Sequence, residues 1–317
     1  MKLKSLVDNC FLHFNAGETR AALHELKNQV SSGNKIFITL SGAMSTARIG
    51  KLLAPAIEQG LIGAVCCTGA NLEEDVFNAI DGDKYKRVDW RNLSGEAEEA
   101  LAAEGWNRVT DVCIPETVMN NIWALLIKSW NDAPGNSPYY HMGNALKALK
   151  AADADIPRLP ESWVAACLTH NIPVFVPGWS DSTTGNMFTV SVKEGAVSQK
   201  YSAVMSDAEQ FAVLGNWYEA HVKATGSGPA FLQIGGGIAG DWPICVVPSL
   251  RQDENKDVPH WSYFCQIGDA PASYGGYSGA PPNEKITWDK VSHATPKFAI
   301  QSDASIVLPI MLAYLLE

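Results

Sequence analysis

Lys290 is the residue of this chain that stands out on chemical grounds, as a candidate for covalent catalysis through an imine. A lysine amine forms imines once burial or a neighbouring cation lowers its pKa and leaves it uncharged. Trp288, two residues earlier, is placed to supply an apolar wall, whereas Asp289 favours the charged, unreactive ammonium. Taken alone, these residue types favour an ordinary surface lysine, and imine chemistry is the alternative.

Acidic residues and a glycine triplet are the candidates for ligand contacts. Glu73 and Glu74 could hydrogen-bond a ribose, but complementing the positive end of a helix is the favoured interpretation. Asp181 lies among hydroxyl residues and suits an Asx turn or a ligand-orienting role equally well. The triplet 235–237 lets a phosphate approach backbone amides, or simply ends a strand flexibly. No GxGxxG fingerprint accompanies it.

Several other functions are disfavoured by what the chain lacks. Its seven cysteines include no CxxC pair and no histidine at metal-ligand spacing, so neither a zinc site nor a disulfide scaffold is predicted. No GxSxG elbow supports a hydrolase triad. A net charge of −10 without any Lys/Arg block disfavours a nucleic-acid partner.

The N-terminal residues and the longest apolar run argue against export and membrane insertion. Residues 1–7 lack the apolar region of a signal peptide. The run 306–316 is too short for a bilayer span, which takes about 20 residues. We therefore expect a cytoplasmic protein with no membrane partner and no metal.

The elements that must position these residues follow a strand–helix alternation. Strands separated by helices are typical of parallel sheets, so we predict an α/β fold with a largely parallel central sheet flanked by helices. We expect one domain, 1–317, opened by a short helical segment, 1–34, with a mixed helix-and-loop excursion at 111–160. The predicted strands are 35–40, 62–67, 172–176, 230–234, 263–267 and 298–300, and helices are predicted near 49–57, from 72, at 205–224 and at 305–316.

Polar turns follow most of these predicted strands. In open α/β sheets, ligands bind beyond the carboxyl ends of the strands. The hydroxyls, glycines and acids of these turns are therefore expected to surround one crevice. The turns are 41–46, 68–75, 178–186, 235–241 and 268–279.

Six sequence blocks, in their order and spacing, resemble those of the deoxyhypusine synthase family, and the resemblance runs from about Lys35 to the C-terminus. The blocks are SGAMSTARIG (41–50), TGANLEED (68–75), IPVFVPGWSDSTTGNM (172–187), IGGG (234–237), SGAPPNEKITWDK (278–290) and DASIVLP (303–309).

The resemblance implies a Rossmann-like NAD-binding fold and a homotetramer with active sites between paired subunits. In that family NAD oxidises spermidine, an aminobutyl group passes to an active-site lysine as an imine, and 1,3-diaminopropane leaves. The group then moves to a lysine of a translation factor, so a protein-lysine acceptor is implied. Homospermidine synthases are similar enzymes that use putrescine as the acceptor.

Carried over by position, the resemblance places the catalytic lysine at Lys290, the aromatic wall at Trp288 and an amine-binding carboxylate at Glu284. Lys290 thereby becomes the strongest candidate of the chain. The implied NAD contacts are Thr46, Thr68, Glu73, Glu74, Asp181, Gly236, Gly237, Ser278, Ser302 and Asp303.

The substrate side departs from the family pattern at several positions. Asp241 stands where a histidine run follows the glycine triplet, and Asn186 replaces an amine-binding carboxylate with an amide. Tyr274 and Tyr277 replace two further acids. Losing the charged partner of a buried amine typically costs several kcal/mol. Spermidine is therefore expected to bind poorly unless Asp241 supplies a replacement charge, so Asp241, Asn186 and Tyr277 join Glu284 and Trp288 as candidate substrate contacts.

Three functions follow from these observations. The first is an NAD-dependent transferase that moves an aminobutyl-type group from a polyamine or related amine through a Lys290 imine to an amine acceptor. The second keeps this chemistry with a small amine as the acceptor, in the manner of homospermidine synthase. The third is a catalytically silent NAD-binding paralogue, suggested by the changes at Asp241 and Tyr277.

Overall fold

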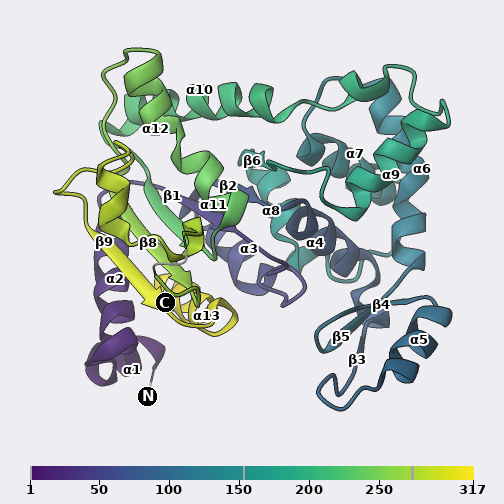
Figure 1. Ribbon diagram of the computed structural model, residues 1–317, viewed down its shortest axis with the longest axis horizontal. Coiled ribbons are helices and arrows are strands. Elements are labelled where there is room, and N and C mark those ends of the chain that lie inside the picture. Colours follow the sequence, from purple (N-terminus) through teal and green to yellow (C-terminus); the bar gives the residue numbers. More distant parts are fainter. Residues whose placement is uncertain (1, 153, 273–274) are drawn as a thin grey trace.

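A six-stranded parallel sheet forms the centre of the computed structural model, which describes residues 2–152, 154–272 and 275–317 (Figure 1). Its neighbour order is β6-β2-β1-β7-β8-β9. Counted along the chain, these strands have the order 3-2-1-4-5-6, which is that of a Rossmann fold. The strands are Ile36–Leu40 (β1), Ile62–Cys67 (β2), Val174–Phe175 (β6), Ala230–Ile234 (β7), Tyr263–Gly268 (β8) and Lys297–Gln301 (β9).

Helices cover both faces of this sheet, which explains why its central strands are buried and mostly apolar. Every residue of β1 is buried. Because side chains alternate along a strand, Ile36 and Ile38 enter the core on one face, while Phe37 packs on the other against Trp261 and Phe231. The helices are α1 (Leu3–Cys10), α2 (Phe14–Ser31), α3 (Gly50–Glu58), α4 (Gly69–Asp81), α8 (Trp163–His170), α9 (Thr183–Lys193), α10 (Asp207–Thr225), α11 (Gly237–Ile244), α12 (Val246–Pro248) and α13 (Ala304–Leu316).

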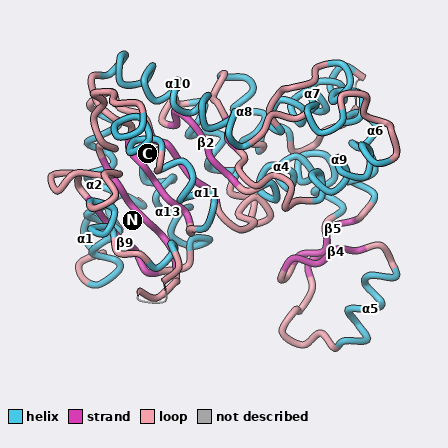
Figure 2. The backbone as a smooth tube through the Cα atoms, turned by 45° about the horizontal axis from the view of Figure 1, so that its top comes forward, coloured by secondary structure: helices cyan, strands magenta, loops and turns pink. Residues whose placement is uncertain are grey.

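The excursion from the sheet begins earlier than the sequence pattern predicts and opens with strands. A small antiparallel sheet is formed by β3 (Lys86–Arg87), β4 (Trp106–Val109) and β5 (Val112–Pro115), with α5 (Gly95–Ala103) beside it. Figure 2 shows this unit projecting away from the central sheet. Its strands are short, and β3 and β4 are half-buried or exposed, so they lack the apolar runs that indicate a strand. Two helices, α6 (Thr117–Asp132) and α7 (Pro138–Ala151), follow.

Buried polar side chains of α4 connect the loops at the carboxyl end of the sheet. The Asn71 amide donates to the Leu40 and Gly42 carbonyls and accepts from the Ser45 amide at 2.9 Å. One turn later, Asp75 accepts from the Val164 amide at 3.0 Å and from the Ser162 hydroxyl. Both side chains therefore fix the loop after β1 and the start of α8 relative to α4.

The buried acids of α4 predict that stability falls as the pH rises through the neutral range. Burial raises the pKa of Asp75 to about 7, and burial with the charge of Glu73 raises the pKa of Glu74 to about 8. Between pH 4 and 7 the folded state then holds protons that the unfolded chain has lost, so each unit of pH costs stability. We expect the free energy of unfolding to drop by about 1–3 kcal/mol from pH 5 to pH 8, measured by urea titration at each pH. In Asp75→Asn the drop should be smaller, and an equal drop in that variant would contradict this assignment.

Candidate active site

Lys290 lies in a buried position at the edge of a cavity, paired with a carboxylate from another part of the chain. Its side chain is 9 % exposed, and its Nζ donates to Oδ1 of Asp241 at 2.9 Å. Asp241 belongs to α11, which starts at the last glycine of the triplet that follows β7. This carboxylate is 47 % exposed and remains open to the cavity. The surface-lysine interpretation of Lys290 is therefore wrong.

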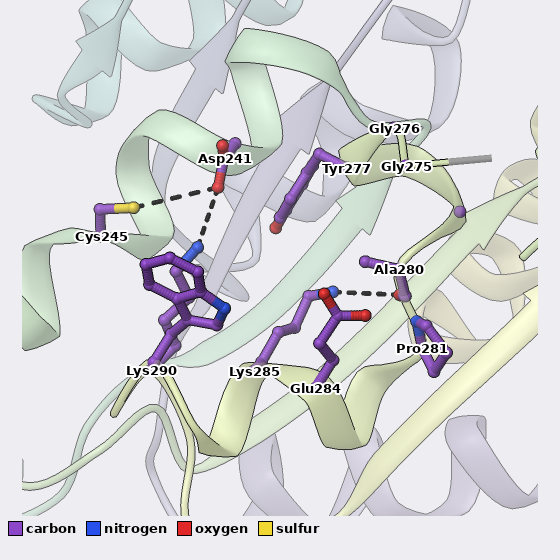
Figure 3. Close-up of a pocket in the computed structure, with 12 residues that line it drawn as sticks. Asp241, Cys245, Gly275, Gly276, Tyr277, Ala280, Pro281, Glu284, Lys285 and Lys290 are labelled. Carbon is purple, nitrogen blue, oxygen red and sulfur yellow. Dashed lines mark hydrogen bonds and ion pairs between the residues drawn. The ribbon is translucent and has the colours of Figure 1, made fainter. Parts of the chain in front are cut away.

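The cavity has a volume of about 660 Å³ and brings together most of the predicted substrate contacts (Figure 3). Asn186 is not among them, because it lies exposed on α9. Tyr274 lies outside the described residues. The lining consists of Asp241, Cys245, Gly275, Gly276, Tyr277, Gly279, Ala280, Pro281, Glu284, Lys285, Trp288 and Lys290.

Two aromatic rings flank the Lys290 ammonium. Its Nζ lies 5.3 Å from the centre of the Tyr277 ring and 5.9 Å from that of Trp288, distances at which a ring attracts a cation. Trp288 is 64 % exposed, so it walls the cavity on the solvent side. Tyr277 donates its hydroxyl to Oε1 of Gln233 at 2.7 Å. Burial raises the pKa of Tyr277, which keeps this hydroxyl protonated.

Lys285 is a second lysine of the cavity that sequence reasoning missed. It is 2 % exposed, and its Nζ lies 4.8 Å and 4.9 Å from the ring centres of Tyr277 and Phe264. The Ala280 carbonyl accepts a long hydrogen bond of 3.3 Å from it. Burial, aided by the charge of Lys290, lowers the pKa of Lys285 to about 8. The sequence around Lys285 does not indicate that this residue is buried, because it stands in a polar segment next to Glu284.

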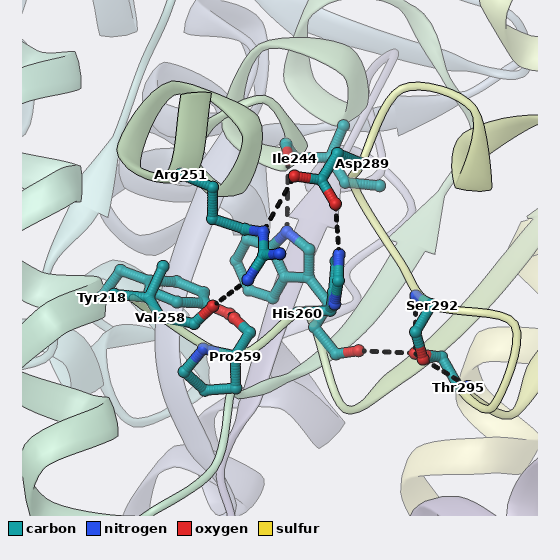
Figure 4. A network of polar contacts seen from close by, with 10 residues as sticks. Tyr218, Ile244, Arg251, Val258, Pro259, His260, Asp289, Ser292 and Thr295 are labelled. Carbon is teal, nitrogen blue, oxygen red and sulfur yellow. Dashed lines mark hydrogen bonds and ion pairs between the residues drawn. The ribbon is translucent and has the colours of Figure 1, made fainter. Parts of the chain in front are cut away.

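Asp289 does not act on Lys290 as its place in the sequence suggests. Its carboxylate accepts from Nε of Arg251 at 2.8 Å and is paired with His260 (Figure 4). Burial raises the pKa of Asp289, but the hydrogen bonds from His260 and Arg251 outweigh burial and hold it below the usual value. The residue takes a left-handed backbone conformation, φ 54°. The anion that contacts Lys290 is Asp241. Asp289 instead holds the backbone immediately before Lys290 in place, through its contacts with Arg251 and His260.

Replacing Asp289 is expected to lower stability in a graded order. In Asp289→Ala, the ion pairs are lost and the left-handed backbone remains, so we expect a loss of about 1–3 kcal/mol. Asp289→Gly loses the same ion pairs but tolerates the backbone conformation, so its loss should be smaller by roughly 1 kcal/mol. Urea unfolding measures both values. Equal losses in the two variants would show that the left-handed backbone conformation does not affect the free energy of unfolding.

Three of the expected cofactor contacts are occupied by structural hydrogen bonds. Glu73 accepts from the Thr183 and Thr184 amides at 3.0 and 2.7 Å, which caps α9. Thr68 caps α4, and its hydroxyl donates to the Gly42 carbonyl. Asp303 caps α13 by accepting from the Ser305 amide at 2.7 Å. The favoured interpretation of the acidic run, complementing a helix N-terminus, thus applies to Glu73, although the helix is α9 rather than its own.

Other expected cofactor contacts retain free polar atoms. Among the described residues, Oγ1 of Thr46 and Oε2 of Glu74 are buried without a hydrogen-bond partner. Gly237 has a φ of 58° and open space at its Cα. Gly236 packs tightly against Ser278, so a Cβ added to Gly236 would lie 2.0 Å from Oγ of Ser278. Ser302 follows β9, where its amide donates to the Gly268 carbonyl. Asp181 is exposed in the turn after β6.

The loops after β1 and β7 meet where the strand order reverses. The Ser41 amide donates to the Ile234 carbonyl at 3.1 Å, and its hydroxyl donates to the Gly236 carbonyl. In Rossmann sheets the dinucleotide crevice lies at this switch point. The unpartnered oxygens of Thr46 and Glu74 and the open Gly237 fit a nucleotide there, despite the missing GxGxxG pattern. The first turn of α11, next to this crevice, leads directly to Asp241.

The part of the chain that the structure describes contains neither a metal site nor a membrane-spanning helix. There, no group of three or more His, Cys, Asp or Glu side chains is arranged to hold a metal ion. None of the described helices combines the length and the hydropathy that a bilayer crossing requires.

Comparison with known proteins identifies the family. The chain is 27% identical to a "Deoxyhypusine synthase-like protein" of Cyanothece sp., over 98% of this chain and 78% of the relative. It is 26% identical to "Probable deoxyhypusine synthase 2" of Methanosarcina mazei, over 87% of this chain and 75% of the relative. The fold matches the crystal structure of a deoxyhypusine synthase homologue from Entamoeba histolytica with a TM-score of 0.54 and 12% identity, covering 99% and 92% of the two chains. Because the deoxyhypusine synthase family model also matches residues 7–315, this chain belongs to the deoxyhypusine synthase family.

Proposed function

We propose that this protein is an NAD-dependent transferase that moves an aminobutyl-type group from a polyamine or related amine to an amine acceptor through an imine on Lys290. The observation that carries this proposal is the contact of the buried Lys290 with Asp241 at 2.9 Å, in a cavity beside the Rossmann crevice. Family membership supports the transferase class.

Different residues of the cavity and of the crevice beside it would bind the cofactor, accept a proton and attack the substrate. NAD, when bound, would supply the acceptor for the hydride that leaves the carbon next to the substrate nitrogen. Thr46, Glu74 and Gly237 would hold it, since they offer free polar atoms or open backbone. Asp241 is placed to accept a proton from the Lys290 ammonium, which leaves a neutral amine. That amine attacks the oxidised carbon, and the departing amine takes a proton, leaving the transferred group joined to Lys290 as an imine.

The wall of the cavity protects this reaction from water. Tyr277 and Trp288 flank the Lys290 nitrogen, and aromatic surroundings slow the hydrolysis of an imine by excluding solvent. Glu284 is exposed on the lining and would bind a substrate ammonium. The acceptor amine then repeats the exchange at the imine carbon and frees Lys290. The hydride taken up in the first step would finally return to the imine of the acceptor, which gives a secondary amine and restores NAD.

Product analysis distinguishes the acceptors. The protein is incubated with NAD, spermidine and either putrescine or a lysine-containing protein substrate, and the products are identified by mass spectrometry. Transfer to putrescine indicates the homospermidine synthase-like activity, and transfer to a protein lysine indicates the deoxyhypusine synthase-like one. NAD binding without turnover of any amine would contradict both and indicate the catalytically silent paralogue.

We further propose that the chain works as a single domain, in the cytoplasm, and as a homotetramer. This part of the proposal rests on family membership. Analytical ultracentrifugation at micromolar concentration tests the assembly: a species of four times the chain mass is expected, and a stable monomer would contradict it.

A further inference from the structure

Lys285 is a buried cation of the cavity without a carboxylate beside it. Among the described residues, no Asp or Glu oxygen lies within 4.0 Å of its Nζ, and the long bond to the Ala280 carbonyl is its one hydrogen bond. An ammonium that is taken out of water costs free energy unless an anion compensates it. Burial, together with the charge of Lys290, lowers the pKa of Lys285 to about 8, and the opposing influence of Glu284 and Asp241 does not reverse this. The cavity therefore contains a positive site that a ligand anion would complete.

The carboxylates of the cavity, Asp241 and Glu284, favour the charged form of Lys285, but neither lies within ion-pair distance of its Nζ. Asp241 is paired with Lys290. Glu284 is exposed, and among the described residues no basic side chain lies within ion-pair distance of it. Figure 3 shows Glu284 and Lys285 rising from the same short helical segment toward the cavity. The lining thus offers one buried ammonium and one exposed carboxylate to a ligand, a pattern that suits a zwitterion.

A polyamine matches this pattern poorly. All its ionised groups are cations, so any ammonium near Lys285 meets a like charge at low dielectric, which is destabilising. An amine that also carries a carboxylate can place each group against its opposite. The nitrogens of Lys285 and Lys290 lie 4.8 and 5.3 Å from the same ring centre of Tyr277, so one small ligand can reach both.

We propose that the cavity binds an amine that bears a carboxylate, of the diamino acid class, with the carboxylate held by Lys285 and an amino group by Glu284. Reaction of this ligand at Lys290 rests on the proposed function above, whereas its binding does not. Lys285 is then the residue that selects a zwitterionic amine over a polycation.

The sharpest test compares two probes that differ only by a carboxylate, L-ornithine and putrescine, on the NAD-loaded protein. In calorimetry we expect the wild type to bind L-ornithine at least tenfold more tightly than putrescine. Lys285→Met should weaken L-ornithine binding at least tenfold and leave putrescine binding unchanged or stronger. Lys285→Arg, which keeps the charge, should preserve the preference. Tighter binding of putrescine by the wild type, or no effect of Lys285→Met, would overturn the inference.

A second measurement needs no variant. An anion beside Lys285 favours its charged form, so binding near pH 8 must draw protons from the solvent. Calorimetry of L-ornithine in two buffers of different ionisation enthalpy should show proton uptake in excess of that with putrescine. Equal proton uptake for both probes would contradict a carboxylate at Lys285.

NADH formation, followed by absorbance in parallel samples, separates this inference from the proposed function. L-Ornithine binding that depends on Lys285, with no NADH formed from L-ornithine, spermidine or putrescine, supports the inference and contradicts the transferase. NADH formation with spermidine or putrescine, together with no preference for L-ornithine, supports the transferase and overturns the inference. Binding of neither probe overturns the inference as well.

Lys285→Met is also expected to stabilise the protein without ligand. At pH 7 Lys285 is charged in both the folded and unfolded states, so the folded protein bears the full cost of burying the ammonium. Removing that charge should raise the Tm at pH 7 by about 2–6 °C. The gain should shrink as the pH rises from 8 to 10, where the folded state already holds a neutral amine. A lower Tm, or a gain that does not depend on pH, would show that Lys285 is compensated within the cavity.

Discussion

Replacing Lys290 by alanine is expected to reduce NAD-dependent amine turnover by at least about a thousandfold. No other group can replace a lysine nitrogen as the carrier of an imine, and loss of a covalent nucleophile has effects of this size. Because hydride transfer precedes the attack by Lys290, the loss is measured as the rate of aminobutyl transfer from spermidine to putrescine or to a protein lysine, with the product quantified by mass spectrometry. NAD binding should remain within a few-fold of the wild type, because Lys290 is not among the expected contacts of the cofactor.

A matched control is Lys290→Arg. The guanidinium keeps a positive charge beside Asp241 but stays protonated and forms no imine under these conditions. This variant should fold like the wild type and be as inactive as Lys290→Ala. If either variant kept more than a tenth of the wild-type turnover, the reaction would not pass through Lys290. Comparable activity loss in Lys285→Met would point to the other lysine of the cavity.

Asp241→Asn is expected to lower kcat by about 10²–10³-fold, the usual contribution of a positioned proton acceptor. The amide can still lie against the Lys290 nitrogen, but it cannot take its proton. The loss should fall on kcat, with the KM of the amine substrate changed by no more than a few-fold, because Asp241 contacts Lys290. A purely structural role for Asp241 would instead lower the free energy of unfolding along with the rate.

The control for this variant is Asp241→Glu, which keeps the carboxylate but moves it by one methylene. Partial activity with a wild-type KM is expected. If Asp241→Asn and Asp241→Glu lost equal activity, the position of the carboxylate rather than its charge would matter. If neither lost activity, the 2.9 Å contact with Lys290 would have no catalytic role.

The central sheet was predictable because its strands are buried on both faces. Runs such as 36–40 and 62–67 are mostly apolar and are separated by a helix, which is the pattern of a parallel sheet. The short β6 at 174–175 lies within the predicted strand 172–176. The half-buried or exposed β3 and β4 of the small sheet carry no such pattern. Their pairing depends on tertiary contacts, so the extent of the excursion could not be predicted.

Site residues could be predicted from the sequence where the chemical type of the residue indicates its role. Asp241 joins Lys290 in the structure, although its role could be stated only as a replacement charge in a departure from the family pattern. The sequence shows which residues are charged, but it does not show which partners they contact or how deeply they are buried. Glu73 caps a helix from another segment, Asp289 turns to Arg251 and His260, and Lys285 is buried in a polar stretch. Each outcome is decided by residues far away in the sequence.

The most direct test of the account is to trap the intermediate. The protein is incubated with NAD and spermidine, with putrescine and agmatine in parallel, reduced with borohydride and mapped by peptide mass spectrometry. The account predicts an aminobutyl-sized adduct on Lys290 that depends on NAD and is absent from Lys290→Arg. No adduct with any amine, in a protein that binds NAD, or an adduct on Lys285 instead, would contradict it.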